Sequence, residues 1–172
     1  VLVEAATLLS GLSQLGTSAS ILRYYPYLKK KKNKDNGFFF WSIVIPLIGF
    51  ALFSLVYVIL KTPITSYFAE KSELFNSFYF YVLPLAFFLL YVTVFEANAN
   101  VLLRIVVPKF VREVLVRVLS LGCYLIYAFR LISLEGFVIA FCGVYAVAMI
   151  IDIVYLFRLG KISIRPNYAF LT

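Results

Sequence analysis

Five apolar segments, each near or above the ~20 residues that a helix needs to cross the hydrocarbon core of a bilayer, dominate this sequence. Hydrophobic residues make up 63% of the 172 residues and charged residues only 14%, whereas about 25% is usual in soluble domains. The pattern therefore predicts an all-α fold, a polytopic transmembrane helix bundle that forms a single domain over residues 1–172. The five predicted spans cover residues 2–25, 37–60, 77–103, 114–132 and 137–157.

The connections between these spans are predicted from proline, glycine and charged residues. Pro26 is expected to end the first helix, because proline disfavours the helical conformation of the residue before it. A lysine-rich loop then follows at residues 29–35, with the sequence KKKKNKD. We expect a mixed loop over residues 61–76, a basic connection along the interface at 104–113, and a tight turn at 133–136.

The charge is strongly positive and unevenly distributed. Sixteen Lys and Arg residues against eight Asp and Glu give a net charge of +8. Such a surplus would suggest nucleic acid in a soluble protein, but in so apolar a chain it indicates loops facing an anionic membrane leaflet, so membrane lipids and not nucleic acid are the expected partners. Thirteen of the 16 basic residues fall on the side of the lysine loop, and Lys61, Lys71 and Arg130 fall on the other. The positive-inside rule then makes the basic loops cytoplasmic.

The composition lacks residues that many catalytic mechanisms require. The chain has no histidine, so it lacks an imidazole base and the commonest metal ligand. Cys123 and Cys142 both lie inside apolar runs, where a buried thiol is the simplest interpretation. We therefore expect no enzyme, no catalytic residues, no metal and no cofactor.

Polar residues near the end of the third span are candidates for function. Glu96 precedes Arg104 by eight residues, which places it about 12 Å deeper along a helix. Asn100 follows one turn later on the same face, and Asn98 lies between them. The asparagines are candidate substrate-binding residues and Glu96 a candidate for ion coupling or helix pairing. Both a polar cavity lining and hydrogen bonding between helices remain open.

Asp152 is the second acidic residue inside a predicted span, about 9 Å from the end marked by Arg158. It is a candidate for ion coupling or for pairing with another helix, for which Arg117 is the expected partner. Arg117 is itself a candidate substrate-binding residue, and it has two other acidic residues to pair with, Glu96 and, at i,i+4, Glu113.

Two further arginines are candidate ligands for an anionic substrate. Arg130 is a basic residue at the opposite membrane face, where it either binds an anion, extends to the interface or pairs with Glu135. Arg23 precedes Tyr24 and further tyrosines, a combination that suits a phosphate or a sugar but equally suits a membrane-interface anchor.

Proline and glycine inside the spans are candidate hinges. Pro46, Pro84, Gly49 and Gly143 permit kinks in otherwise apolar helices. We expect them to allow the helices to move relative to one another.

The order of these features resembles a known family of transporters. The stretches GTSASILRYYPYL, LLRIVVPKFVREVLVRVLSLGCYLIY and YLFRLGKISIRP, with the lysine loop after the first, resemble polysaccharide flippases, often called lipopolysaccharide biosynthesis proteins. These belong to the multidrug/oligosaccharidyl-lipid/polysaccharide exporter superfamily. The resemblance covers essentially the whole chain, which begins with Val1 and is expected to be a fragment holding the second through sixth helices.

The resemblance implies a fold, a substrate and a location. The fold would be part of one half of a twelve- or fourteen-helix transporter with a central cavity. The substrate would be an undecaprenyl-diphosphate-linked oligosaccharide, moved across the bacterial inner membrane, and other polysaccharide assembly proteins are possible partners. Two alternatives stay open: a cation-coupled drug or small-solute antiporter of the same superfamily, and a membrane scaffold that transports nothing.

Overall fold

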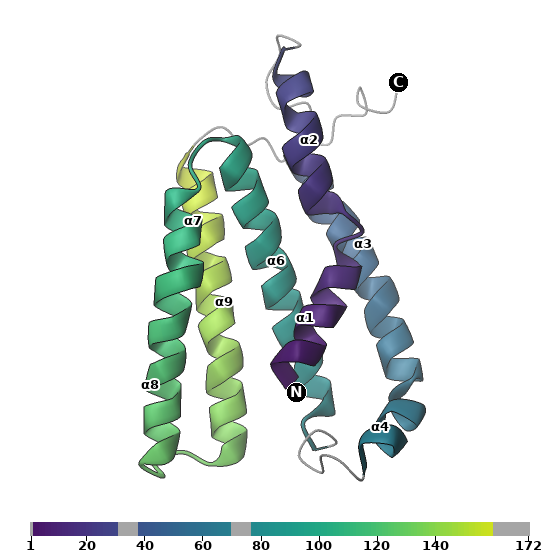
Figure 1. The fold of residues 1–172 in the computed structure, drawn as a ribbon, viewed down its shortest axis with the longest axis vertical. Coiled ribbons are helices and arrows are strands. Elements are labelled where there is room, and N and C mark those ends of the chain that lie inside the picture. The colour runs from purple at the N-terminus through teal and green to yellow at the C-terminus, as the bar shows by residue number, and fades with distance from the viewer. Residues whose placement is uncertain (1, 31–37, 70–76, 160–172) are drawn as a thin grey trace.

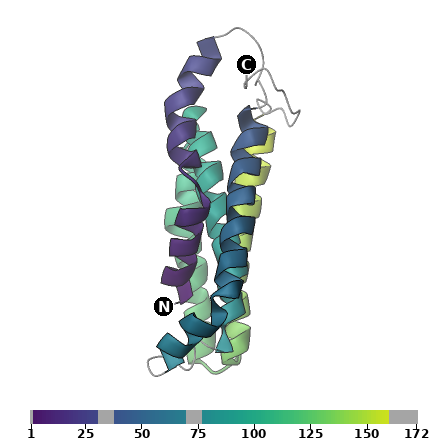
Figure 2. The ribbon, with the colours of Figure 1, turned by 90° about the vertical axis from the view of Figure 1, so that its right-hand side faces the viewer.

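The computed structural model describes residues 2–30, 38–69 and 77–159 of the chain. Every described element is helical, so the predicted all-α class is confirmed. The helical segments lie roughly side by side, and successive long segments run in opposite directions, with the first two helices pointing the same way (Figure 1). A view turned by 90° shows that they form more than one layer (Figure 2). In chain order they are α1 (Leu2–Ser13), α2 (Thr17–Lys30), α3 (Phe38–Ile59), α4 (Lys61–Ala69), the 3-10 helix η1 (Tyr79–Tyr81), α6 (Val82–Val101), α7 (Val106–Phe110), the π-helix η2 (Val111–Leu115), α8 (Val116–Ala128) and α9 (Leu134–Arg158).

Among the described residues, three segments are long and apolar enough to cross a membrane, and they make the chain a multi-pass membrane protein. They are Phe39–Ile59, Tyr79–Val101 and Leu134–Arg158, with 21, 23 and 25 residues. Large apolar side chains are exposed along α3, among them Leu52 and Leu55. A helix that is apolar all round is stable when lipid, and not water, covers its outer face.

The segment predicted as one span over residues 2–25 consists of two helices. The backbone leaves the helical conformation at Leu15 and Gly16, where φ is +48° and +72°. The expectation that Pro26 ends the helix is wrong, because α2 continues to Lys30. Proline removes a single backbone hydrogen bond, and the remaining bonds of the turn carry the helix past it.

The fourth segment is helical from Val106 to Ala128, because α7, η2 and α8 follow one another without a gap. The predicted basic connection over residues 104–113 is therefore wrong for most of its length. Pro108 is the third residue of α7, where a backbone N–H has no partner to lose, so it starts the helix instead of interrupting it. The helix ends before the predicted residue 132, because Arg130 adopts a left-handed conformation with φ +57°.

The predicted turn at residues 133–136 is instead the start of α9. The Ser133 side chain accepts a hydrogen bond from the Gly136 N–H at 3.2 Å and caps the helix, as serine commonly does. The predicted loop over 61–76 contains the short helix α4. Its remainder, residues 31–35 of the lysine loop and residues 160–166 lie outside the described residues.

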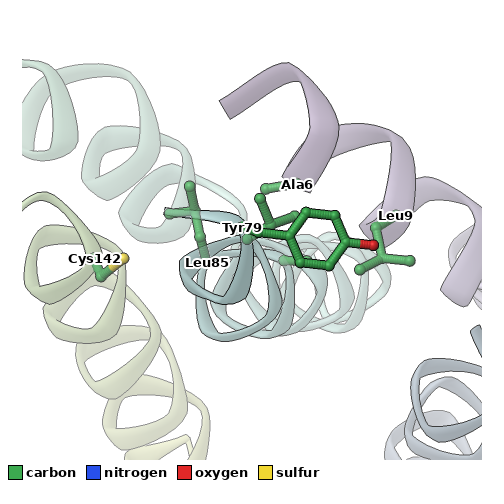
Figure 3. Packing of buried hydrophobic residues seen from close by; sticks show 7 residues of the cluster. Ala6, Leu9, Tyr79, Leu85 and Cys142 are labelled. Atoms are coloured by element: carbon green, nitrogen blue, oxygen red, sulfur yellow. The ribbon is translucent and has the colours of Figure 1, made fainter. Parts of the chain in front are cut away.

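The core is built around α6, which packs against α9, α1, α2 and α3. One cluster joins Ala6 and Leu9 of α1 to Tyr79 and Leu85, and Cys142 of α9 completes it (Figure 3). This position of Cys142 confirms the prediction of a buried thiol.

A pair of stacked tyrosines fixes the end of α3 against η1. The rings of Tyr57 and Tyr79 are 4.3 Å apart and nearly parallel. The Tyr79 hydroxyl donates to the Tyr57 carbonyl at 2.6 Å, and the Tyr57 hydroxyl donates to the Tyr79 carbonyl at 3.3 Å. Each tyrosine hydroxyl thus donates to the backbone carbonyl of the other residue. Such a partner is what a tyrosine hydroxyl needs in an apolar setting.

The alternation of helix direction gathers the basic residues. The C-terminal ends of α2, α6 and α9 and the N-terminal ends of α3 and α7 lie toward the same end of the bundle (Figure 1). The basic residues of these segments are Arg23 in the middle of α2, Arg104 between α6 and α7, Lys109 of α7, Arg112 of η2 and Arg158 of α9. Lys61 and Arg130 belong to elements at the opposite end, as the charge pattern predicts.

Candidate functional site

A small cleft lies between α2 and α3 near the basic end of the bundle. Its volume is about 250 Å³, and its walls combine the rings of a tyrosine and a tryptophan with the hydroxyl groups of one threonine and two serines. We call it the α2/α3 cleft, and its lining residues are Leu15, Thr17, Ser20, Ile21, Tyr24, Trp41, Ser42 and Ile45.

Thr17 is the polar group of the cleft that stands out. Its side chain is 5% exposed, and its hydroxyl has no hydrogen-bond partner among the described residues. A buried hydroxyl without a partner costs about 1–3 kcal/mol. A ligand in the cleft that offers a hydrogen-bonding group would remove that cost.

The break between α1 and α2 gives the cleft its shape. Thr17 is the first residue of α2, directly after the left-handed residues Leu15 and Gly16. The end of α1 lies so close to α3 that a Cβ atom on Gly49 would overlap the Ser13 carbonyl oxygen. Gly49 therefore serves close helix packing, and its role as a hinge stays a prediction.

Behind the cleft, a buried hydrogen bond joins α3 to α6. The Asn98 side-chain amide donates to the Ser42 hydroxyl at 3.2 Å and to the Val94 carbonyl at 2.8 Å. Ser42 in turn donates to the Phe39 carbonyl at 2.7 Å. Asn98 is thus placed in contact with a second helix, which favours the helix-joining interpretation of this residue, whereas Asn100 has no side-chain hydrogen bond within the described part of the chain.

A second polar site lies where α6, α9 and η2 pack together. The Arg112 guanidinium donates to the Glu96 carboxylate at 2.7 Å. The Glu96 side chain is 16% exposed and that of Arg112 is 52% exposed. Arg112 belongs to the π-helix η2, a rare conformation that often marks functional positions.

Asp152 of α9 is the most deeply buried charged residue among those described. It is 0% exposed, and neither carboxylate oxygen has a hydrogen-bond partner in the described residues. Leu156, one turn after Asp152 on α9, lies in one cluster with Phe95 of α6, the residue before Glu96, so the two acidic residues lie where α6 and α9 pack together. We call Glu96, Arg112 and Asp152 the charge cluster.

The expected pairing of Arg117 with Asp152 or Glu96 is wrong. Arg117 donates to Glu113 at 2.7 Å, the alternative at i,i+4. Arg117 follows the π-helix and points away from the core, with a side chain 76% exposed. Glu96 pairs with Arg112, which the sequence pattern did not single out.

Arg130 and Arg23 are both exposed. Within the described part of the chain, no ion pair joins Arg130 to Glu135. The Arg130 backbone N–H instead donates to the Tyr127 carbonyl at 2.9 Å. This bond closes the end of α8. Arg23 lies over the Tyr24 ring at 5.9 Å, beside the α2/α3 cleft but not among its lining residues.

The three remaining candidate hinges differ in their surroundings. Pro84 is the third residue of α6, so it occupies the first turn, where proline requires no kink. Gly143 has open space around it. Pro46 does lie inside α3, where a kink remains its expected effect.

Sequence reasoning missed Thr17, Ser42 and Arg112. Small hydroxyl residues inside apolar helices look alike in sequence, and no signal separates one that lines a cleft from one that bonds its own backbone, as Ser13 does. Arg112 falls in the predicted connection, so the sequence pattern does not place it on a helix that faces Glu96. Placing residues 106–113 on a helix would have revealed it.

Comparison with known proteins gives no assignment. No protein-family model, no curated protein and no solved structure matches the chain.

Proposed function

We propose that the chain is part of a membrane transporter that moves lipid-linked oligosaccharide precursors of surface polysaccharide from the cytoplasmic to the outer leaflet by alternating access. In this proposal it contributes five spans to one half of a twelve- or fourteen-helix flippase. The helical run from Val106 to Ala128 and the α1–α2 pair would be the two spans beyond the three identified by length and composition. The protein would lie in a bacterial inner membrane with its basic loops in the cytoplasm.

The α2/α3 cleft is the observation that supports this proposal best. Aromatic rings such as those of Tyr24 and Trp41 offer flat apolar faces, and Thr17, Ser20 and Ser42 offer hydroxyls. A sugar ring presents both apolar C–H faces and hydroxyl groups, so this lining matches it. The volume of about 250 Å³ is slightly below that of typical pockets for drug-sized ligands, which suits one part of a larger headgroup.

The charge distribution supports the same proposal. A diphosphate linked to a lipid needs cationic groups near the membrane surface, and Arg23 adjoins the cleft at the basic end of the bundle. Undecaprenyl-diphosphate-linked oligosaccharide is therefore the proposed partner, with membrane lipids and other polysaccharide assembly proteins around it. Arg117 and Arg130 are weaker candidates, because one is paired with Glu113 and the other lies at the opposite end.

The experiment is complementation of a cell that lacks its own O-antigen or capsule flippase by the gene that encodes this chain. Surface polysaccharide is the readout, at matched membrane abundance. We expect Tyr24→Leu and Thr17→Val to reduce it, and the matched control Tyr124→Leu, an exposed tyrosine on α8, to leave it unchanged. Normal polysaccharide in both cleft variants would remove the cleft from the proposal.

The alternative of a cation-coupled antiporter is favoured by one observation, the buried Asp152. If proton- or sodium-driven efflux of small solutes depends on Asp152 while polysaccharide is never restored, this second function replaces the first. A scaffold without transport predicts that Asp152→Asn and Glu96→Gln change stability but no flux.

A further inference from the structure

The charge cluster combines two largely buried carboxylates, those of Glu96 and Asp152, with the half-exposed guanidinium of Arg112. Arg112 bonds to Glu96 at 2.7 Å, and no ion pair within the described residues joins it to Asp152. With all three groups ionised, the cluster has a net charge of −1. If Asp152 carries a proton, the net charge is zero, and no uncompensated charge remains in the cluster.

The other charged groups near Asp152 do not supply the missing partner. Helix α9 packs against α6, η2, α7, α8 and η1, and Glu113 of η2 is already bonded to Arg117. Among the described residues, none of their side chains bonds to Asp152. The titratable groups on these elements and along the neighbouring part of α9 are Glu96 and Tyr91 of α6, Arg112 and Glu113 of η2, Lys109 of α7, Arg117, Cys123, Tyr124 and Tyr127 of α8, Tyr79 and Tyr81 of η1, and Tyr145, Tyr155 and Arg158 of α9.

The surroundings of Asp152 are apolar. The face of α9 that packs inward carries Ala148 one turn before it and Leu156 one turn after it, both 0% exposed. Leu156 lies in a cluster with Phe95 and Ala99 of α6, the residues that flank Glu96 by one and three positions. An isolated carboxylate in such a place is among the most expensive groups to bury.

We propose that Asp152 is a proton-binding site whose occupancy is controlled by the Glu96–Arg112 ion pair. One proton from the cytoplasmic end converts the Asp152 carboxylate to the neutral acid, and release reverses the step without breaking any other bond. The Glu96 carboxylate accepts a hydrogen bond from Arg112 at 2.7 Å, and the proposed step leaves this pair in place. The inference does not depend on which substrate is transported, since proton binding is read directly.

A proton fits this site better than a metal ion. Metal ions need several oxygen or nitrogen ligands, and the described residues contain no group of three or more Asp, Glu, Cys or His side chains that could hold one. A proton needs only one carboxyl oxygen. Asp152 supplies that oxygen by itself.

The sequence permits a test with a single labelled residue. Its two aspartates are Asp35 and Asp152, so Asp35→Asn leaves Asp152 as the sole aspartate. The full chain, labelled with ¹³C at the aspartate carboxyl carbon, is placed in neutral phospholipid vesicles, and infrared difference spectra are recorded across pH. We expect an isotope-shifted carboxylic-acid C=O band at neutral pH that disappears as the pH is raised.

This measurement leaves Asp152 in place, so it does not require a variant of that residue to fold. Carboxylate bands alone across the whole accessible pH range would overturn the proposal. Loss of the acid band on adding Na⁺ at constant pH would also overturn it, because a metal cation would then occupy the site.

A second comparison tests the control by Glu96. Glu96→Gln removes the neighbouring negative charge and frees Arg112, and both changes favour ionised Asp152. We expect the band to disappear at a pH about one unit lower, a tenfold weaker proton affinity. Glu113→Gln, which breaks the exposed pair with Arg117, is the matched control and leaves the midpoint unchanged. An unshifted midpoint in Glu96→Gln would overturn the role given to the ion pair.

Discussion

The contact between α3 and the end of α1 makes a sharp stability prediction for Gly49→Ala. A Cβ atom at this position would overlap the Ser13 carbonyl oxygen and would lie about 3.0 Å from the Leu15 side chain. The obstructing atom belongs to the backbone, so it moves only if the break between α1 and α2 moves. Overpacking of this kind typically costs about 1–3 kcal/mol.

Replacing glycine by alanine also stabilises a helix through its higher helix propensity, by up to about 1 kcal/mol. The control must therefore be a Gly→Ala substitution that has this gain without a steric overlap. Gly143 supplies it, because it lies inside α9 and a Cβ atom added there would meet no other atom within 4 Å. We therefore expect Gly49→Ala to be less stable than Gly143→Ala by about 1–3 kcal/mol. The assay is reversible unfolding of the full chain in mixed micelles, followed by circular dichroism. Equal stability of the two variants would refute the close approach of α1 and α3.

Two further predictions concern hydrogen bonds between elements. Asn98→Ala removes the bond to Ser42 and is expected to lower the unfolding free energy by about 1 kcal/mol. The control Asn100→Ala loses no side-chain bond within the described residues and should change the unfolding free energy little. Equal losses for the two variants in the same unfolding assay would contradict the structure. Tyr79→Phe keeps the ring stacked on Tyr57 but loses the 2.6 Å hydrogen bond to the Tyr57 carbonyl. We expect the unfolding free energy to fall by about 1 kcal/mol. An unchanged unfolding midpoint would show that the bond contributes nothing to stability.

The errors in the predicted boundaries share a physical origin. Pro26 is expected from sequence to end a helix, and Pro108 falls in the predicted connection. The effect of proline depends on its position within a helix, since it is harmless in the first turn and tolerable where one lost hydrogen bond is outweighed by neighbouring contacts. Leu15 and Gly16 form the real break in the first segment, and a leucine gives no warning of a left-handed conformation.

The candidate polar residues were partly predictable. Glu96, Asn98 and Asp152 stand out in the sequence because polar side chains inside apolar helices must face protein or water. Which partners they meet was not predictable, because each partner comes from another helix. Ser42 is 56 positions from Asn98 and Arg112 is 16 from Glu96, and only the packing of α6 against its neighbours brings them together.

The amino-acid sequence by itself determined that this chain is helical, enters the membrane several times and gathers its basic residues at one end. Those properties follow from the hydrophobicity and charge of each segment taken separately, because these decide whether the segment enters the bilayer and how it is oriented there. Only the tertiary structure decided that Asn98 joins two helices, that Thr17 lines a cleft and that Asp152 is buried with no partner among the described residues. Such facts depend on the register and rotation of one helix against another, and these are set by close contacts such as that of Gly49 with α1, which no single segment specifies.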